Sequence, residues 1–450
     1  MLHTRPFVLR TDESSHFCEK KVQAGDSSDL IRFPKNKRRR IMLASKFCHK
    51  FITNTLTKIH KKRKESLIRM VDSLIRGANL TVSSIGRHLS GKASVKHKIN
   101  MSWRFLKNPL LKEALPLIYS QVGTQLMSGL RELPIAIDWS GCCGNKTFLL
   151  RASLLYQGRS LAIYNEVHCS KLQENKDVHR NFLHRLKEIL PPNKKVIIVT
   201  DAGFKTPWFK EVAQLGWFFV GRVLGNICYK LDSEEQWYLA EHLHSQVKRG
   251  QTLFIGKGSL GKKSKTQFKL TFVAHFGRSK GRKNTKIRFP DAEKKQQNLA
   301  RQPWILVTNL ENSQSSIKPI KLALYTKQIY QKRMQIEQNF RDDKSTQFGA
   351  AWRFSRTQHI DKINILMLLA MLAALILWMI GFAAEQKKLH YSFQANTVRD
   401  KRVLSFPFLA RQLIIQGFKG LNIRKFSKIL SLFQIQFNEF SLLEQAEFQL

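Results

Sequence analysis

The segment Ile363–Ala384 contains no charged residue, and nearly all of its side chains are apolar. It is long enough to cross a bilayer, because about 20 helical residues span the hydrocarbon core. Such a segment folds as a membrane span or as a core helix that other elements cover on all sides. The chain has no second stretch of this kind. We therefore predict a buried helix in a soluble protein and keep a single membrane span as the alternative.

The chain is strongly basic: 77 Lys and Arg against 32 Asp and Glu give 450 residues a formal charge of +45. Because so many like charges repel one another, the protein needs an anionic partner. Nucleic acid is the first candidate and an anionic membrane surface the second, whereas small neutral substrates are unsuitable. Residues 1–40 are predicted to be a basic polar leader, either a solvated tail or an arm whose run Lys35–Arg40 contacts phosphates.

The six cysteines include no C-x-x-C pair and do not form a disulfide framework. No four Cys and His residues have the spacing of a zinc finger, so we predict no structural zinc. The first thirty residues carry five acidic side chains and no apolar core, which excludes a signal peptide and disfavours a transit peptide. We expect a cytoplasmic, nucleoid-associated protein.

Residues 41–130 have helical apolar spacing and are predicted to form a DNA-binding domain. Leu80–Leu89, with Gly86 at a turn, and Trp103–Leu106 resemble a helix-turn-helix. Cationic side chains surround this stretch, and they contact a phosphate backbone or are merely solvated. They are Lys92, Lys96, His97, Lys98, Arg104 and Lys107.

A different pattern begins at residue 131, where strands precede and then alternate with helices. The expected order is strand, strand, strand, helix, strand, helix, strand, at 135–138, 149–156, 160–168, 177–189, 195–201, 207–215 and 217–223. This is the order of a ribonuclease H-like mixed sheet in an α/β fold. We assign residues 131–384 to that domain, with its last catalytic helix at Tyr325–Lys344.

A β-rich insertion is predicted before that helix, at about 225–310, because apolar runs recur at 252–255, 268–276 and 304–308. It contains a basic loop suited to phosphates, with the cations Arg278, Lys280, Arg282 and Lys283. Residues 385–450 again have helical spacing with many phenylalanines. They are predicted to cover the core or a partner subunit, so this region is a possible dimerisation surface.

Three acidic residues form the candidate catalytic site. Asp138 ends the first strand and Asp201 ends the fourth, and these strands are neighbours in the expected sheet. Facing carboxylates repel one another unless cations lie between them. A pair of Mg²⁺ ions, with Mn²⁺ as a substitute, suits such a site and the chemistry of phosphodiesters. A third carboxylate, Glu337, completes the set.

Glu337 belongs to a stripe of polar residues on the predicted helix. At about 100° per residue, it lies on the same face as Tyr330, Arg333 and Lys344. The simple alternative is an exposed face with ion pairs such as Arg333–Glu337. We instead expect the carboxylate to reach the metals while the other three reach DNA phosphates.

The spacing Tyr330-x2-Arg333-x3-Glu337-x6-Lys344 resembles the Y-R-E-K signature of bacterial cut-and-paste transposases of the insertion-sequence-four family. Five other segments look similar to that family's blocks: 138–140, 150–153, 200–204, 303–309 and 393–399. The resemblance covers roughly residues 45 to 415. Residues 1–40 and the extreme C-terminus depart from it.

The resemblance implies a DDE triad of Asp138, Asp201 and Glu337 that acts on double-stranded DNA as a homodimer on paired transposon ends. It also implies nicking, hairpin formation, hairpin opening and strand transfer, with Trp304 stacking on an extruded base. The alternatives are a ribonuclease H-like nuclease or resolvase without strand transfer, a non-catalytic DNA-binding protein and a single-span membrane protein.

Overall fold

The computed structural model describes residues 35–144, 146–156, 158–262, 268–277, 302–310, 318–346, 349–395, 397–416 and 426–446. Most of the predicted leader lies outside these ranges. The predicted phosphate-binding loop also lies outside the described residues, with Arg278, Lys280, Arg282 and Lys283.

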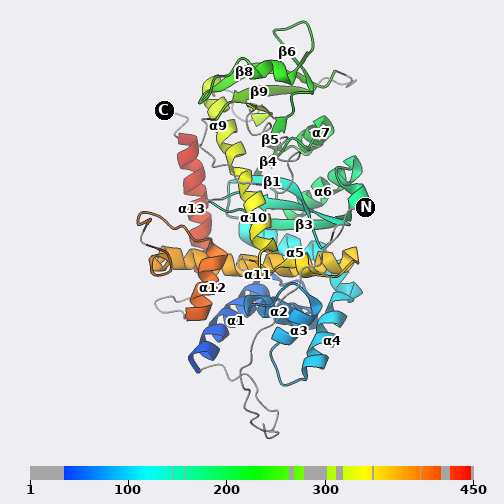
Figure 1. Ribbon diagram of the computed structural model, residues 1–450, viewed down its shortest axis with the longest axis vertical. Coiled ribbons are helices and arrows are strands. Elements are labelled where there is room, and N and C mark those ends of the chain that lie inside the picture. The colour runs from blue at the N-terminus through cyan, green and yellow to red at the C-terminus, as the bar shows by residue number, and fades with distance from the viewer. Residues whose placement is uncertain are drawn as a thin grey trace, which may run out of the picture.

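A mixed sheet of ten described strands forms the centre of the molecule (Figure 1). Its first half contains β1 (Glu132–Gly141), β2 (Thr147–Leu154), β3 (Leu161–Cys169), β4 (Lys195–Thr200) and β5 (Phe218–Val223), in the spatial order β3-β2-β1-β4-β5. The pairs β1–β2 and β2–β3 are antiparallel, whereas β1–β4 and β4–β5 are parallel. These alternations and crossovers give a ribonuclease H-like fold, which confirms the predicted fold class.

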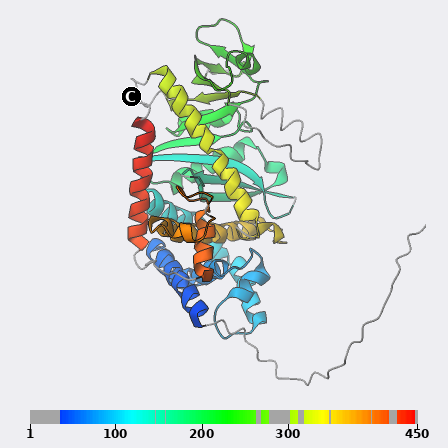
Figure 2. The ribbon, with the colours of Figure 1, turned by 60° about the vertical axis from the view of Figure 1, so that its left-hand side comes forward.

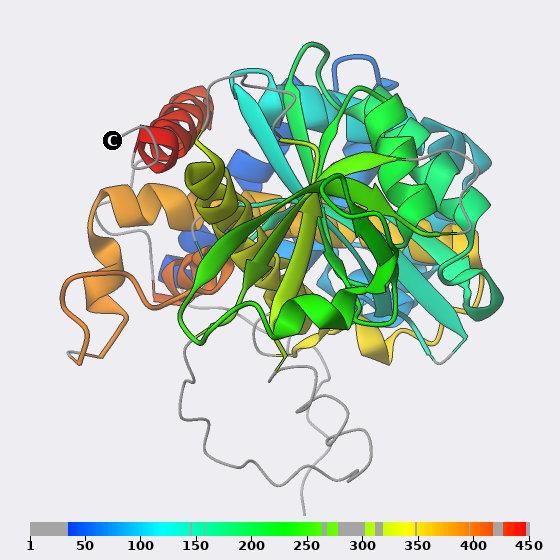
Figure 3. The ribbon, with the colours of Figure 1, turned by 90° about the horizontal axis from the view of Figure 1, so that it is seen from above.

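The β-rich insertion continues the same sheet. It contributes β6 (Cys228–Leu231), β7 (Tyr238–Leu239), β8 (Thr252–Leu260), β9 (Lys269–His275) and β10 (Trp304–Thr308). Strand β10 pairs antiparallel with both β5 and β9, so the last strand of the insertion joins it to the core. Seen from above, the strands fan out with a strong twist (Figure 3).

Helices cover both faces of the sheet. One face carries α6 (Lys176–Ile189) and α7 (Thr206–Gln214), with α5 (Pro109–Met127) against α6. The other carries α9 (Pro319–Lys332) and α10 (Met334–Lys344), which run diagonally across the strands in Figure 2. We predicted one helix here, but two meet at Arg333, where the N–H groups of Arg333 and Ile336 bond to carbonyls three residues back. Short 3₁₀ turns lie at Ser170–Leu172, Ala240–His244, Trp352–Phe354 and Leu389–Ser392.

The N-terminal helices are α1 (Lys35–Thr55), α2 (Lys61–Ile75), α3 (Val82–His88) and α4 (Val95–Leu106). Thr81 and Ser94 cap α3 and α4 by accepting backbone N–H bonds. These two helices cross closely, because a Cβ on Gly86 would lie 2.5 Å from the Cα of Ile99. Gly86 lies inside α3, where the absence of a side chain permits this close packing, and not at the turn that we predicted.

The uncharged segment forms the centre of α11 (Ile360–Gln386), between the sheet and the N-terminal helices in Figure 1. In the part of the chain that the structure describes, α11 is the one helix long and apolar enough to cross a membrane, and 94% of its most apolar window is buried. It contacts α2, β3, α12 (Phe406–Gln416) and α13 (Phe426–Ala446). The prediction of a buried core helix is therefore confirmed.

Helix α11 also covers one edge of the sheet. The amide side chain of Asn364 accepts a bond of 2.9 Å from the N–H of Val167 on the outermost strand, β3. At its other end, Trp378 stacks with Phe382 and meets Phe406 of α12 and Phe433 of α13 edge-on. These phenylalanines of the C-terminal region therefore cover the chain's own core.

The crossing of α11 and α12 provides a test of this architecture. A Cβ on Gly381 would lie 2.1 Å from the carbonyl oxygen of Phe406. We expect Gly381→Ala to lower the free energy of unfolding by about 1–3 kcal/mol, because the two helices must separate. Gly141→Ala is the control, since no atom lies within 4 Å of that Cβ position. Equal stabilities of both variants in urea denaturation would contradict this packing.

Candidate active site

Asp138 and Asp201 lie side by side on the parallel strands β1 and β4. Asp201 directly follows the last residue of β4, but β1 continues to Gly141, so the prediction that Asp138 ends its strand is wrong. The register pairs Ala136 of β1 with Val199 of β4, which places the two aspartates two residues further along at the same level. Each carboxylate accepts a nearby backbone N–H: Asp138 from Trp139 at 2.8 Å and Asp201 from Gly203 at 2.9 Å. The strand register therefore brings together the first two predicted site residues.

A buried guanidinium joins Asp138 to the third predicted carboxylate. Arg333 donates from Nη1 to Asp138 Oδ2 at 3.3 Å, and from Nη2 to Glu337 Oε1. Its side chain is only 10% exposed. Burial disfavours the charged guanidinium, but Tyr330, Asp138 and Glu337 outweigh that effect and raise the pKa of Arg333. Arg333 is therefore a fixed cation between two carboxylates.

One guanidinium does not balance the negative charge of this site. Burial and the nearby Asp201 and Glu337 raise the pKa of Asp138 to about 7, although Arg333 and the Trp139 N–H act in the opposite direction. The rise shows that ionised Asp138 lacks sufficient positive charge around it. The site consequently favours an additional cation.

The residues present fit a hard divalent metal ion. The donors are carboxylate oxygens, which Mg²⁺ and Mn²⁺ prefer. No group of three His, Cys, Asp or Glu side chains in the described ranges is gathered tightly enough to form a complete metal site. Arg333 keeps Glu337 apart from the two aspartates, because its guanidinium pairs directly with the Glu337 carboxylate. Asp138, Asp201 and Glu337 are the residues that would hold the metal.

Helix α10, which carries Glu337, is fixed to the sheet by a residue that sequence analysis did not single out. Arg151 on β2 is fully buried. It donates to Asp343 at 2.6 Å, to Asn165 at 2.8 Å and to Asn339. A charged residue inside an apolar strand was the available signal, because a buried arginine requires partners. Two of its partners, Asn339 and Asp343, lie 188 and 192 residues further along the chain, so local spacing did not reveal them.

Further polar contacts fix both ends of α10. Arg159 pairs with Asp342 at 2.9 Å, and the N–H of Tyr156 donates to Gln335 at 3.1 Å. Lys344 donates to Ser140 on β1 at 2.7 Å, and burial lowers the pKa of its amine. Because Ser140 is two residues after Asp138 on β1, this bond holds the Lys344 amine close to the proposed site.

The remaining described members of the predicted site form an aromatic wall next to Arg333. Tyr330 is buried, and burial raises the pKa of its phenol despite the neighbouring Arg333. Its ring meets Trp304 edge-on at 5.0 Å, and Trp304 also lies 5.4 Å from His275. The half-buried Trp304 is thus one aromatic ring away from Arg333.

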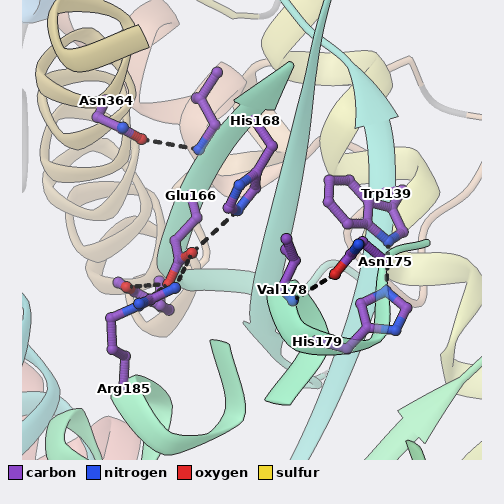
Figure 4. Close-up of polar contacts among 10 residues, drawn as sticks. Trp139, Glu166, His168, Asn175, Val178, His179, Arg185 and Asn364 are labelled. Carbon is purple, nitrogen blue, oxygen red and sulfur yellow. Dashed lines mark hydrogen bonds and ion pairs between the residues drawn. The ribbon is translucent and has the colours of Figure 1, made fainter. Parts of the chain in front are cut away.

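A second polar cluster surrounds Trp139 (Figure 4). Because successive strand residues point to opposite faces, it lies on the face of β1 away from the Asp138 side chain. Trp139 donates its indole N–H to His179 of α6 at 3.0 Å, and its ring lies 5.6 Å from that of His168. Burial, with His168 and Lys205 nearby, lowers the pKa of His179 to about 4. The buried Glu166 accepts from Arg185 through both carboxylate oxygens.

Comparison with known proteins identifies the class. The family model described as "Transposase DDE domain" matches residues 134–375. Because this match covers more than half of the chain, the protein belongs to that family and is a DDE transposase of the insertion-sequence type. Such enzymes act on DNA and generally use divalent metal ions. No curated protein matches the chain as a relative. The matched segment includes Asp138, Asp201 and Glu337.

The raised pKa of Asp138 predicts a pH-dependent gain in stability for Asp138→Asn without metal. For a carboxyl group with a raised pKa in the folded state, the stabilisation is complete below about pH 4 and is lost as pH rises through about 7. The variant should therefore exceed wild type by about 2–4 kcal/mol at pH 8 and by well under about 1 kcal/mol at pH 4. Urea denaturation in EDTA measures this difference.

Asp361→Asn is the matched control, because Asp361 forms an exposed pair with Lys112. It should show no comparable gain at pH 8. An equal stability difference between wild type and Asp138→Asn at both pH values would contradict the predicted charge imbalance.

Proposed function

We propose that this transposase cuts and joins DNA with Asp138, Asp201 and Glu337 as its catalytic carboxylates, and that it belongs to the insertion-sequence-four group with the Y-R-E-K signature. The main support is the mutual electrostatic influence of the three carboxylates, with Arg333 between two of them. All three lie inside the segment that matches the family. The spacing of Tyr330, Arg333, Glu337 and Lys344 supports the narrower assignment.

In the proposed mechanism, the three carboxylates would hold two divalent ions, Mg²⁺ or Mn²⁺. When bound, the ions lower the barrier by polarising the phosphate and favouring deprotonation of the attacking group. Arg333 keeps Asp138 and Glu337 oriented, and its remaining N–H groups face developing charge on the phosphate. Lys344, fixed at Ser140, contacts a flanking phosphate.

The proposed reaction has four displacements at phosphorus. Water attacks first and releases a 3′-hydroxyl. That hydroxyl attacks the opposite strand and closes a hairpin at the element's end. A second water reopens the hairpin, and the regenerated 3′-hydroxyl finally attacks target DNA. Each step forms one P–O bond and breaks another, so the net bond count is conserved.

Trp304 is proposed to stabilise the bent DNA of the hairpin. A tight hairpin requires one base to leave the stack, which costs a few kcal/mol. Stacking on an aromatic side chain returns about 1–3 kcal/mol. Half-buried Trp304, supported by Tyr330 beside Arg333, offers such a surface near the carboxylates. Arg278, Lys280, Arg282 and Lys283, which lie outside the described residues, are also proposed to contact phosphates.

The N-terminal helices are proposed to bind the duplex at the element's end. Helix α4 exposes Lys96, His97, Trp103 and Arg104, and Lys107 directly after it is also exposed. Lys107 lies over the Trp103 ring at 3.7 Å, which combines a cation with an aromatic surface. Such a face suits the major groove and its phosphate backbones. This assignment covers residues 41–130.

The proposed functional assembly is a homodimer on two paired DNA ends, in the cytoplasm and associated with the nucleoid. The net charge of +45 supports assembly on DNA, because phosphates relieve repulsion between the two subunits. Residues 385–450 are the proposed contact region. Ile415 and Ile435 lie there with 58% and 54% of their surface exposed.

Removal of any one catalytic carboxylate should abolish cleavage while DNA binding persists. We expect Asp138→Asn, Asp201→Asn or Glu337→Gln to lower the rate of nicking at least 10³-fold, because a metal ligand is lost in each. The substrate is labelled duplex carrying the element's flanking repeats, with Mg²⁺. Gel-shift affinity in EDTA should change little.

Asp361→Asn is again the control, since Asp361 is an exposed carboxylate paired with Lys112. Nicking near the wild-type rate in one of the three variants would remove that residue from the site. Cleavage without any joining by wild type would instead indicate a nuclease.

Trp304→Ala should separate two steps of the reaction. The first nick does not require an extruded base and should keep at least half of its rate. Hairpin formation should fall tenfold or more, which corresponds to about 1.4 kcal/mol or more. Gel assays of end-labelled DNA resolve both products. Equal loss of both steps, or loss of folded protein, would show that Trp304 is structural.

A further inference from the structure

His179 contacts the segments that follow both proposed catalytic aspartates. Its Nε2 accepts the indole N–H of Trp139, which comes directly after Asp138 (Figure 4). Its ring also stacks on Phe204, with centroids 4.9 Å apart and planes at 25°. Phe204 lies three residues after Asp201. A single imidazole on α6 therefore contacts both Trp139 on β1 and Phe204 in the segment after β4.

Short covalent paths connect these contacts to the two carboxylates. On β1, the backbone N–H of Trp139 donates to Asp138, so the residue that His179 holds also orients that carboxylate. After β4, the N–H of Gly203 donates to Asp201, and Gly203 is bonded to Phe204. Each aspartate is thus connected by a short stretch of backbone to a residue that His179 contacts.

The surroundings of His179 limit its movement. The residue is only 7% exposed, and the ring of Trp208 lies 5.1 Å away, at 74° to the imidazole plane. The low pKa of His179 keeps the imidazole neutral. One ring nitrogen therefore accepts the hydrogen bond from the Trp139 indole N–H throughout the neutral pH range. Repulsion between Asp138 and Asp201 acts to separate the strand ends that this residue joins.

We propose that His179 is a positioning residue that fixes the relative placement of Asp138 and Asp201 through Trp139 and Phe204. This inference rests on the proposed function of the two aspartates. It assigns the face of β1 opposite the catalytic side a role in metal binding, which His179 exerts through its contacts with Trp139 and Phe204. A misplacement of about 1 Å at such a site is sufficient for a large loss of rate.

A double-mutant cycle tests this role. His179→Phe keeps an aromatic ring against Phe204 but removes the acceptor, whereas Trp139→Phe removes the donor. The double variant places two apolar rings together and leaves no indole N–H without a partner. His184→Phe is the control, because His184 lies on the same helix with 53% of its side chain exposed. The measurements are Mn²⁺ affinity by calorimetry, cleavage rate at saturating DNA, DNA affinity in EDTA and melting temperature.

Each single variant should bind Mn²⁺ at least tenfold more weakly and cleave at least tenfold more slowly, with DNA affinity within twofold. His179→Phe should also melt several degrees lower, because it leaves the N–H of the half-buried Trp139 side chain without its acceptor. The double variant should regain the wild-type melting temperature. It should still cleave as slowly, and bind Mn²⁺ as weakly, as the single variants. The control should match wild type.

Recovery of cleavage together with the melting temperature would overturn the proposal, since His179 would then serve stability alone. Wild-type Mn²⁺ affinity in the single variants would also overturn it. Asp201→Asn serves as the reference for the proposed function. If Asp201→Asn binds Mn²⁺ as wild type does, the metal role of the aspartate fails, and the positioning role with it. Weak binding by Asp201→Asn beside normal binding by His179→Phe would overturn the positioning role only.

Discussion

The concentration of carboxylates around one buried guanidinium is the interaction on which this structure depends. Asp138, Asp201 and Glu337 come from three distant parts of the chain and repel one another at short range. Arg333 bonds to two of them, and the pKa of Asp138 remains raised to about 7. Three carboxylates near one guanidinium leave an excess of negative charge, which favours a divalent cation at this site.

The rest of the fold keeps these repelling groups in place. Parallel pairing of β1 and β4 sets Asp138 and Asp201 at one level. Buried Arg151 ties α10 to β2 through Asp343, and loss of one member of such a pair costs about 3–5 kcal/mol. Helix α11 supports β3 at the edge of the sheet and joins the C-terminal helices to the core. The apolar segment that resembles a membrane span thus packs against the edge strand β3 and supports the sheet that carries the two aspartates.

Much of the fold could be predicted from local sequence pattern, because its strands and helices have clear apolar periodicity. The order of elements from 135 to 223 indicated the ribonuclease H-like sheet, and burial of α11 followed from that order. The spacing of Tyr330, Arg333 and Glu337 likewise indicated one helical face. Long-range contacts were inaccessible to this reasoning: the pairing of β10 with β5, the break at Arg333, the Arg151–Asp343 tie and the contacts of His179.

The most direct test of the catalytic site is to locate its metal by iron-mediated cleavage of the protein backbone. Fe²⁺ replaces Mg²⁺, and ascorbate with peroxide generates hydroxyl radicals that cut the chain close to the bound ion. Mass spectrometry then maps the cuts, with excess Mg²⁺ as competitor. The account predicts cuts near residues 138, 201 and 337 that Mg²⁺ suppresses together. Cuts at only one of these places, or in segments far from all three, would contradict it.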